Sequence, residues 1–375
     1  MISPHEFYSL LKEKEINFFT GVPDSLLKSF CAYLNDNANT KNHIISANEG
    51  GAIALASGYN LATGKIGLVY MQNSGQGNVI NPLVSLADPE VYSIPILLLI
   101  GWRGEPGKQD EPQHVKQGKI TFDLLNVLEI PYEILPDSLE EAEKILEKAI
   151  RYMKEKNAPF ALVAKKGIFE EYALKNETQH SFEMSRENAI KLVVDSLSSE
   201  DIIISTTGKI SRELFEYREE LKQNHDKDFL TVGSMGHSSQ IALGIALQKP
   251  EKQIYCLDGD GSVIMHMGSL AIIGQHARKN FKHIIFNNGA HDSVGGQPTA
   301  GFEIDLQSIA KACGYNISLK AETVEEITEK MNLIKSTEGP ALLEILVNKG
   351  ARKELGRPTK TPKENKNNFM GFLNK

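Results

Sequence analysis

Two short turns in the second half of the chain carry residue types that can hold a phosphate and a metal ion. Gly259-Asp260-Gly261-Ser262 follows an apolar segment, and Asn287-Asn288-Gly289 follows another. Glycines let the backbone approach a phosphate, and the N-terminus of a following helix offers it free N–H groups. A Gly-Asp-Gly sequence alone is typical of a tight turn, so the pairing of the two turns carries the interpretation.

The spacing of the two turns predicts that they are neighbours. Asn288 comes 28 residues after Asp260, which fits one helix plus one strand, so both turns are expected at one edge of a sheet. The Asp260 carboxylate, the Asn288 amide oxygen and the backbone carbonyl of Ala290 would supply three oxygens. Two phosphate oxygens and a water would complete the six-oxygen shell that Mg²⁺ prefers.

This pair of turns resembles the thiamine-diphosphate fingerprint of the thiamine-dependent decarboxylase superfamily. The resemblance implies that a glutamate in the other half of the chain contacts the aminopyrimidine ring. Glu49 is the candidate, because it stands at an expected strand end and helix start; an acidic residue that favours a helix N-terminus is the alternative. The resemblance implies that the following residues bind the cofactor: Glu49, Ser234, Met235, Gly259, Asp260, Gly261, Ser262 and Asn288.

The chemistry explains these requirements. Decarboxylation of a 2-oxo acid leaves an electron pair that needs a sink, which thiamine diphosphate provides. Glu49 would share a proton with the pyrimidine ring and so activate the cofactor. Met235 matches the family position of the apolar side chain under the bend of the cofactor, although a core methionine is nearly as good an interpretation.

The short two-domain layout resembles the phosphonopyruvate decarboxylase family, whose close relatives are the sulfopyruvate decarboxylases. The resemblance rests on Gly21-Val22-Pro23-Asp24-Ser25 and on residues 75–78, 110–114 and 287–299. It implies conversion of 3-phosphonopyruvate to phosphonoacetaldehyde and CO₂, towards 2-aminoethylphosphonate, with sulfopyruvate as the alternative substrate. It also implies a homo-oligomer, at least a dimer, with active sites shared between chains.

Either substrate carries a tetrahedral anion beside the 2-oxo acid, so the pocket needs cations. Arg103 and His114 follow an apolar segment and are expected to bind substrate, although each could be a solvated charge. His114 could also donate a proton. Asp24 and Ser25 match a substrate-facing position of related decarboxylases, and either could also cap the next helix. Lys108 and three tail residues are further candidate cations: Arg352, Lys353 and Arg357.

The elements that must position these residues alternate along the chain. Continuously apolar segments, typical of buried parallel strands, alternate with amphipathic helical patterns. They predict two tandem doubly wound parallel-sheet α/β domains of the thiamine-diphosphate-binding fold, at 1–166 and 185–349, with a linker at 167–184 and a basic tail at 350–375 that is either solvated or a lid. The expected strands lie within 16–22, 43–48, 66–72, 94–102, 159–165, 201–208, 229–234, 253–261, 282–289 and 341–347.

Composition excludes several other classes of protein. The chain has 375 residues, 41% of them hydrophobic and 24% charged, with a net charge of −7, which argues against nucleic-acid binding over the whole surface. Three widely spaced cysteines argue against a disulfide scaffold. Without a signal-peptide core or a long apolar run, a cytoplasmic protein without membrane contact is expected. A non-catalytic nucleotide-binding protein is disfavoured, because no Gly-x-Gly-x-x-Gly follows the first strand of either domain.

Overall fold

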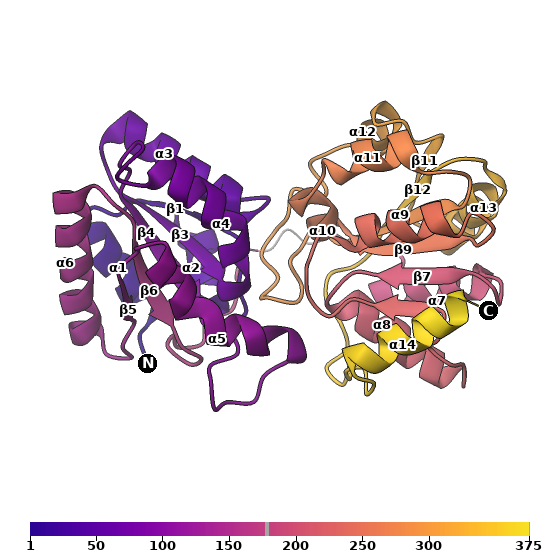
Figure 1. Cartoon of the computed structure of the whole chain (residues 1–375), viewed down its shortest axis with the longest axis horizontal. Helices are drawn as coiled ribbons and strands as arrows, with labels where there is room; N and C mark the ends of the chain where they lie inside the picture. Colours follow the sequence, from indigo (N-terminus) through magenta and orange to yellow (C-terminus); the bar gives the residue numbers. More distant parts are fainter. Residues whose placement is uncertain (177–179, 375) are drawn as a thin grey trace. The chain divides into compact units, whose positions relative to one another are not determined.

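The computed structural model describes residues 1–176 and 180–374, which form two compact units (Figure 1). Of the described residues, the first unit comprises 1–176 together with Val294–Gln297, and the second comprises 180–293 and 298–374. The boundary falls inside the expected linker 167–184, of which residues 177–179 lie outside the described part. Within the described ranges, no helix combines the length and the apolar character needed to cross a membrane.

The first unit is built on a parallel six-stranded sheet with strand order β2-β1-β3-β4-β6-β5. Its strands are β1 (Phe18–Gly21), β2 (His43–Ile45), β3 (Gly67–Gln72), β4 (Ile96–Gly101), β5 (Tyr132–Ile134) and β6 (Phe160–Ala164). Its helices are α1 (Pro4–Glu13), α2 (Lys28–Asn37), α3 (Glu49–Thr63), α4 (Gln76–Pro82), α5 (Pro112–Val127) and α6 (Leu139–Lys156), with short turns η1 (Asn73–Gly75) and η2 (Leu83–Ala87).

The second unit repeats this topology. Its parallel sheet has the order β11-β12-β10-β9-β7-β8, which is the same winding read from the other edge. Its strands are β7 (Ile202–Ser205), β8 (Asp228–Leu230), β9 (Ile254–Gly259), β10 (Phe281–Asn287), β11 (Ile317–Ala321) and β12 (Ala341–Leu346). Its helices are α7 (Arg186–Ser196), α8 (Lys209–Glu220), α9 (Ser238–Gln248), α10 (Asp260–Met265), α11 (Ser269–His276), α12 (Leu306–Ala312), α13 (Val324–Ser336) and α14 (Pro362–Leu373).

Both sheets are buried on their two faces. On β3, Leu68 and Tyr70 belong to one apolar cluster, and the alternate residues Val69 and Met71 belong to another. Successive side chains of a strand point to opposite faces, so helices must cover both sides of the sheet. The doubly wound α/β architecture expected from the apolar segments is therefore confirmed, and every one of those segments overlaps a strand.

Two strands have no counterpart in the sequence-based expectation. β5 and β11 form edges of their sheets, where each pairs with a single neighbour, and most of their residues are only half-buried. An edge strand does not need a continuous apolar sequence, because solvent or a loop covers part of it. The apolar pattern therefore identifies the inner strands and the edge strands β2 and β8, and misses these two.

The expectation that Asp24 or Ser25 caps the following helix is wrong. α2 begins at Lys28, and the residue before it, Leu27, makes no side-chain cap bond. Asp24 instead accepts a hydrogen bond from the N–H of Leu26 at 3.0 Å, within the turn that precedes the helix. The carboxylate thus shapes the connection between β1 and α2.

The tail contains an ordered helix that packs on the second unit. α14 lies against the edge strand β8, with Phe369 buried beneath it. Asn365 bonds to the strand like another backbone segment: its Oδ1 accepts from the N–H of Leu230 at 3.1 Å, and its Nδ2 donates to the carbonyl of Asp228 at 2.8 Å. The end of the tail is therefore part of the fold.

Replacing Asn365 with alanine should lower the free energy of unfolding by about 2 kcal/mol, because two buried backbone groups lose their partners. Urea unfolding followed by circular dichroism measures the change. Asn367→Ala is the matched control, since Asn367 is exposed on the same helix. Equal stability of the two variants would show that Asn365 does not anchor the tail.

Candidate active site

The second unit brings the two predicted turns together. β9 and β10 are adjacent parallel strands, with Gly259 opposite Phe286, so the turns that follow them share one edge of the sheet. Asp260 begins α10 and is 2% exposed. The hydroxyl of Thr299 and the backbone N–H of Asn288 both donate hydrogen bonds to its carboxylate. A Cβ on Gly301 would lie 2.6 Å from Asp260 Oδ2, so the bare glycine makes room for this carboxylate.

Asn288 is oriented by a buried ionic network that sequence reasoning missed. Its Nδ2 donates to Asp292 Oδ2 at 2.9 Å, while its Oδ1 accepts from the N–H of Ala290 at 3.1 Å. Asp292 in turn accepts from Arg186 at 2.7 Å, and Arg186 makes two further bonds of 2.8 Å to Glu213. Asp292 lies four residues after Asn288, but only the fold shows that it sets the direction of the Asn288 amide.

These residues fit a magnesium ion and a diphosphate. The Asp260 carboxylate is desolvated by burial, which raises its pKa to about 6. The groups that donate hydrogen bonds to it are neutral. A cation beside it would compensate for that desolvation. Asp260, the Asn288 amide oxygen and the Ala290 carbonyl are hard oxygen ligands of the kind Mg²⁺ prefers. They are the residues that would hold the ion.

The segment that contains Ser234 and Met235 lies beside the Gly259–Ser262 turn. The Ser262 hydroxyl bonds with the Thr206 hydroxyl at 3.0 Å and accepts from the N–H of Gly236 at 3.2 Å. Gly236 has φ +84°, and a Cβ there would lie 2.4 Å from a ring carbon of His266. Met235 is half-buried and Ser234 exposed. The fold therefore collects the predicted cofactor residues of the second unit in one region.

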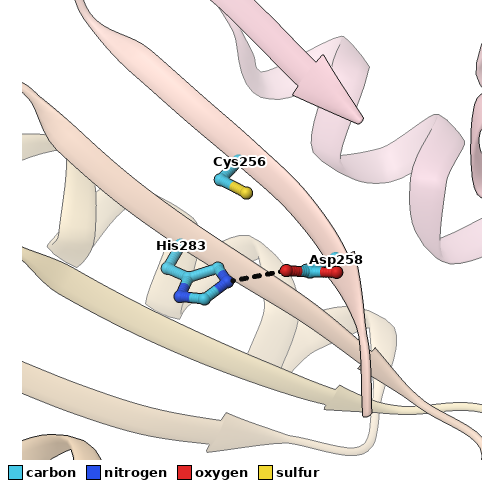
Figure 2. A group of neighbouring side chains, drawn as sticks. All are labelled: Cys256, Asp258 and His283. Atoms are coloured by element: carbon cyan, nitrogen blue, oxygen red, sulfur yellow. Dashed lines mark hydrogen bonds and ion pairs between the residues drawn. The ribbon is translucent and has the colours of Figure 1, made fainter. Parts of the chain in front are cut away.

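A buried polar group on β9 and β10 lies next to the Gly259–Ser262 turn. Figure 2 shows His283, on β10, turned towards Asp258, on β9, with Cys256 beside them; the ring nitrogen and the carboxylate are 3.4 Å apart. Burial raises the pKa of the Cys256 thiol well above its usual value, so the thiol is a neutral neighbour of the pair. Asp258 also accepts from Ser238 at 3.1 Å and from the N–H of Gly259 at 3.0 Å. The Asp258–His283 pair thereby fixes the strand end that leads into Asp260.

Glu49 occupies the corresponding region of the first unit. It is the first residue of α3, whose N-cap Asn48 accepts from the N–H of Gly51 at 2.8 Å, and it is 5% exposed. Its Oε2 accepts from Asn78 Nδ2 at 2.7 Å. A Cβ on Gly75 would lie 2.5 Å from Glu49 Oε1. Gly75 and Asn78 belong to a segment singled out in the sequence, and the structure shows that they hold this carboxylate.

The four residues predicted to contact substrate lie together in the first unit. Arg103 Nη1 donates to the Ser25 hydroxyl at 2.7 Å, and Ser25 lies 3.5 Å from Asp24 Oδ1. Asp110 connects Arg103 to His114, since it accepts from Arg103 Nε at 2.9 Å and is 2.8 Å from His114 Nδ1. Asp110 belongs to the segment 110–114 on which the family resemblance rests, but only the fold shows that it contacts both side chains.

Asp24 is fully buried beside this group, and a Cβ on Gly101 would lie 2.0 Å from its Oδ2. Burial raises its pKa to about 6, against the opposing effect of hydrogen bonds from the backbone and the charge of Arg103. Two other candidate cations are already paired with carboxylates: Lys108 with Glu105 at 2.7 Å, and Arg352 with Glu187 at 3.1 Å.

The raised pKa of Asp24 predicts a pH-dependent cost to stability. The folded protein keeps the proton up to about pH 6 and the unfolded chain loses it near pH 4, so stability falls as pH rises through this window. The free energy of unfolding of Asp24→Asn, relative to wild type, should rise by about 2 kcal/mol between pH 4 and pH 7.

Urea unfolding followed by fluorescence of Trp102, the one tryptophan of the chain, measures this difference in the first unit. Asp123→Asn is the control, because Asp123 is exposed. A pH-independent difference for Asp24→Asn would contradict the assignment of a buried, protonated carboxyl.

The amino-acid sequence of the chain matches two protein-family models and several known proteins. Residues 5–126 match the model of the thiamine pyrophosphate enzyme N-terminal TPP-binding domain, and residues 206–345 match that of the C-terminal TPP-binding domain. Phosphonopyruvate decarboxylases of Streptomyces viridochromogenes and Streptomyces hygroscopicus are each 32% identical to the chain, over 100% and 99% of its length and 95% and 94% of theirs. A sulfopyruvate decarboxylase of Methanosarcina acetivorans is 27% identical over 93% of the chain and 92% of its own length.

Both parts of the chain therefore belong to a thiamine-diphosphate-dependent enzyme, which contradicts the alternative of a non-catalytic nucleotide-binding protein. The relatives are decarboxylases, which makes the protein a carboxy-lyase acting on a small 2-oxo acid. The chain belongs to the phosphonopyruvate decarboxylase family of thiamine-diphosphate enzymes.

Proposed function

We propose that the protein converts 3-phosphonopyruvate to phosphonoacetaldehyde and CO₂, using thiamine diphosphate and Mg²⁺, in a route to 2-aminoethylphosphonate. The observation that carries this proposal is the full-length match to two proteins named phosphonopyruvate decarboxylase. The polar groups of each unit are consistent with this proposal. Oxygen atoms that could bind Mg²⁺ lie together in the second unit, and Arg103 lies beside hydroxyl and carboxylate groups in the first.

Each predicted residue has a role in this proposal. Asp260, Asn288 and the Ala290 carbonyl hold Mg²⁺, while Gly259, Gly261, Ser262, Ser234 and Met235 line the cofactor. Bound thiamine diphosphate would supply the sink for the electron pair that CO₂ leaves on the substrate carbon. Glu49 holds the proton that the pyrimidine ring needs. Arg103 and Ser25 bind the phosphonate end of the substrate, and Asp24 and His114 serve the proton transfers.

Sulfopyruvate is the second candidate substrate. It is supported by the 27% identity to a sulfopyruvate decarboxylase over 93% of the chain. A phosphonate carries one more negative charge than a sulfonate when fully ionised, so the two substrates need different charge compensation around Arg103. The family resemblance further supports a homo-oligomer, at least a dimer, whose active sites are shared between chains.

A coupled aldehyde assay tests the function. Phosphonopyruvate, sulfopyruvate and pyruvate are supplied in turn, each with and without thiamine diphosphate and Mg²⁺. We expect the highest kcat/KM with phosphonopyruvate, and loss of activity when either cofactor is removed. A higher kcat/KM with sulfopyruvate would transfer the assignment to the second candidate.

Replacing Glu49 with glutamine should abolish most turnover and keep much of the cofactor affinity. Glutamine has nearly the same shape and can still accept from Asn78, but it cannot exchange a proton with the pyrimidine ring. We expect kcat to fall by about 100-fold or more, with cofactor binding measured separately by calorimetry. Glu90→Gln, at an exposed position, is the control. Full activity of Glu49→Gln would remove this residue from the mechanism.

A further inference from the structure

One carboxylate organises the substrate-facing residues of the first unit. Asp110 accepts hydrogen bonds from four N–H groups: Arg103 Nε at 2.9 Å, Arg103 Nη2, the N–H of Gly104 at 2.8 Å and the N–H of Glu111 at 2.7 Å. His114 Nδ1 also lies 2.8 Å from its carboxylate. A carboxylate offers about four lone-pair sites, so this one is saturated. Its bonds to Arg103 and His114 mean that neither side chain can reorient independently of it.

The ionisation of Asp110 fixes the chemistry of its partners. Partial burial opposes ionisation, yet the bonds from Arg103 and His114 bring the pKa of Asp110 well below its usual value. An ionised carboxylate can only accept hydrogen bonds. His114 Nδ1 must therefore carry a proton, in the neutral as well as the charged ring, and Nε2 is the nitrogen that gains and loses a proton.

The backbone around Asp110 is shaped for this contact. Gly104 has φ +72°, and a Cβ there would lie 2.0 Å from the carbonyl oxygen of His114. A Cβ on Gly118, in α5, would lie 1.7 Å from the carbonyl oxygen of Gly104. Two glycines thus let the loop after β4 cross the first turns of α5 at close range, which brings Asp110 within reach of both Arg103 and His114.

We propose that Asp110 is the positioning residue of the substrate pocket, which aims Arg103 Nη1 at Ser25 and fixes His114 as the Nδ1–H tautomer with Nε2 as the proton donor. The proposal rests on the proposed function, in which Arg103 and His114 face the substrate. Loss of CO₂ leaves an electron pair on carbon, and one proton must reach that carbon to give the aldehyde. The proton leaves His114 Nε2, which is reprotonated from solvent, while the other proton stays on Nδ1 and is hydrogen-bonded to the Asp110 carboxylate.

The Asp110→Asn variant separates this role from simple support of the loop. Three charged groups act on His114: Asp110 and Glu111 raise its pKa, whereas Arg103, like burial, lowers it. Removing the Asp110 charge should lower the pKa of His114 further, so the basic limb of the kcat–pH profile should move to lower pH. We expect kcat to fall about tenfold at pH 7, without a rise in KM, because Arg103 keeps its charge and loses its competing anion.

The tautomer is read directly by ¹⁵N NMR of histidine-labelled protein without substrate, with His114→Gln to assign the signal. We expect a proton on Nδ1 of neutral His114 in the wild type, and loss of this preference in Asp110→Asn. Glu105→Gln is the matched control; Glu105 is in the same loop and pairs with Lys108 and Lys165. Trp102 fluorescence during urea unfolding checks that each variant is folded.

Two results would overturn the proposal. The first is a wild-type neutral ring protonated on Nε2, and this measurement stands even if Asp110→Asn does not fold. The second is a folded Asp110→Asn with an unchanged pH profile and histidine spectrum. The NMR measurement needs no turnover, so its failure is distinguishable from failure of the decarboxylation assay, which would remove the proposed function instead.

Discussion

Burial of carboxylates at the ends of parallel strands is the constraint on which the rest of the structure depends. Asp24, Glu49 and Asp260 each lie at such an end and are nearly inaccessible to water. A buried carboxylate is unfavourable unless donors or a cation compensate for the lost hydration. Each of the three also lies against a glycine at which a Cβ would come within 2.6 Å of it: Gly101, Gly75 and Gly301 respectively. The glycines allow approaches that any side chain would block.

The common topology of the two units explains why the candidate functional residues come from corresponding places in the two sheets. Both sheets have the same strand order, and in both the polar groups follow the first four strands. In the first unit these strands lead to Asp24, Glu49, Gly75 and Arg103; in the second, to Thr206, the segment 233–237, Asp260 and Asn288. The carboxyl ends of parallel strands form the open edge of a doubly wound sheet, where ligands bind. The same architecture thus presents a different set of polar groups in each unit.

Charge is balanced differently in the two units. In the first, the half-buried Arg103 is paired with Asp110, so the cation has a compensating negative charge beside it. In the second, Arg186 is neutralised by Glu213 and Asp292, and this pairing orients Asn288 from behind. Neither arginine is a free charge, and each acts through the geometry that its carboxylate partners impose. Removing one partner of such a pair leaves a charge without its counterion, so both partners are needed to keep the geometry.

The sequence by itself determined the inner strands, two of the four edge strands, the α/β class and the convergence of Asp260 with Asn288. These follow from local patterns: buried strands must be continuously apolar, and glycine-rich turns must follow them. Glu49 at a helix start and the proximity of Asp24, Ser25, Arg103 and His114 also follow, because all of them succeed such strands.

Only the tertiary structure decided which distant groups become partners. The edge strands β5 and β11, the docking of Asn365 on β8, the true start of α2 and the bonding roles of Thr299, Asp292, Asn78 and Asp110 were not predicted. A polar residue has the same appearance in a sequence whether it ends in solvent or in the interior. Its role depends on which donors and acceptors the packed core brings within 3 Å, and that selection is made by burial over long stretches of chain rather than by local pattern.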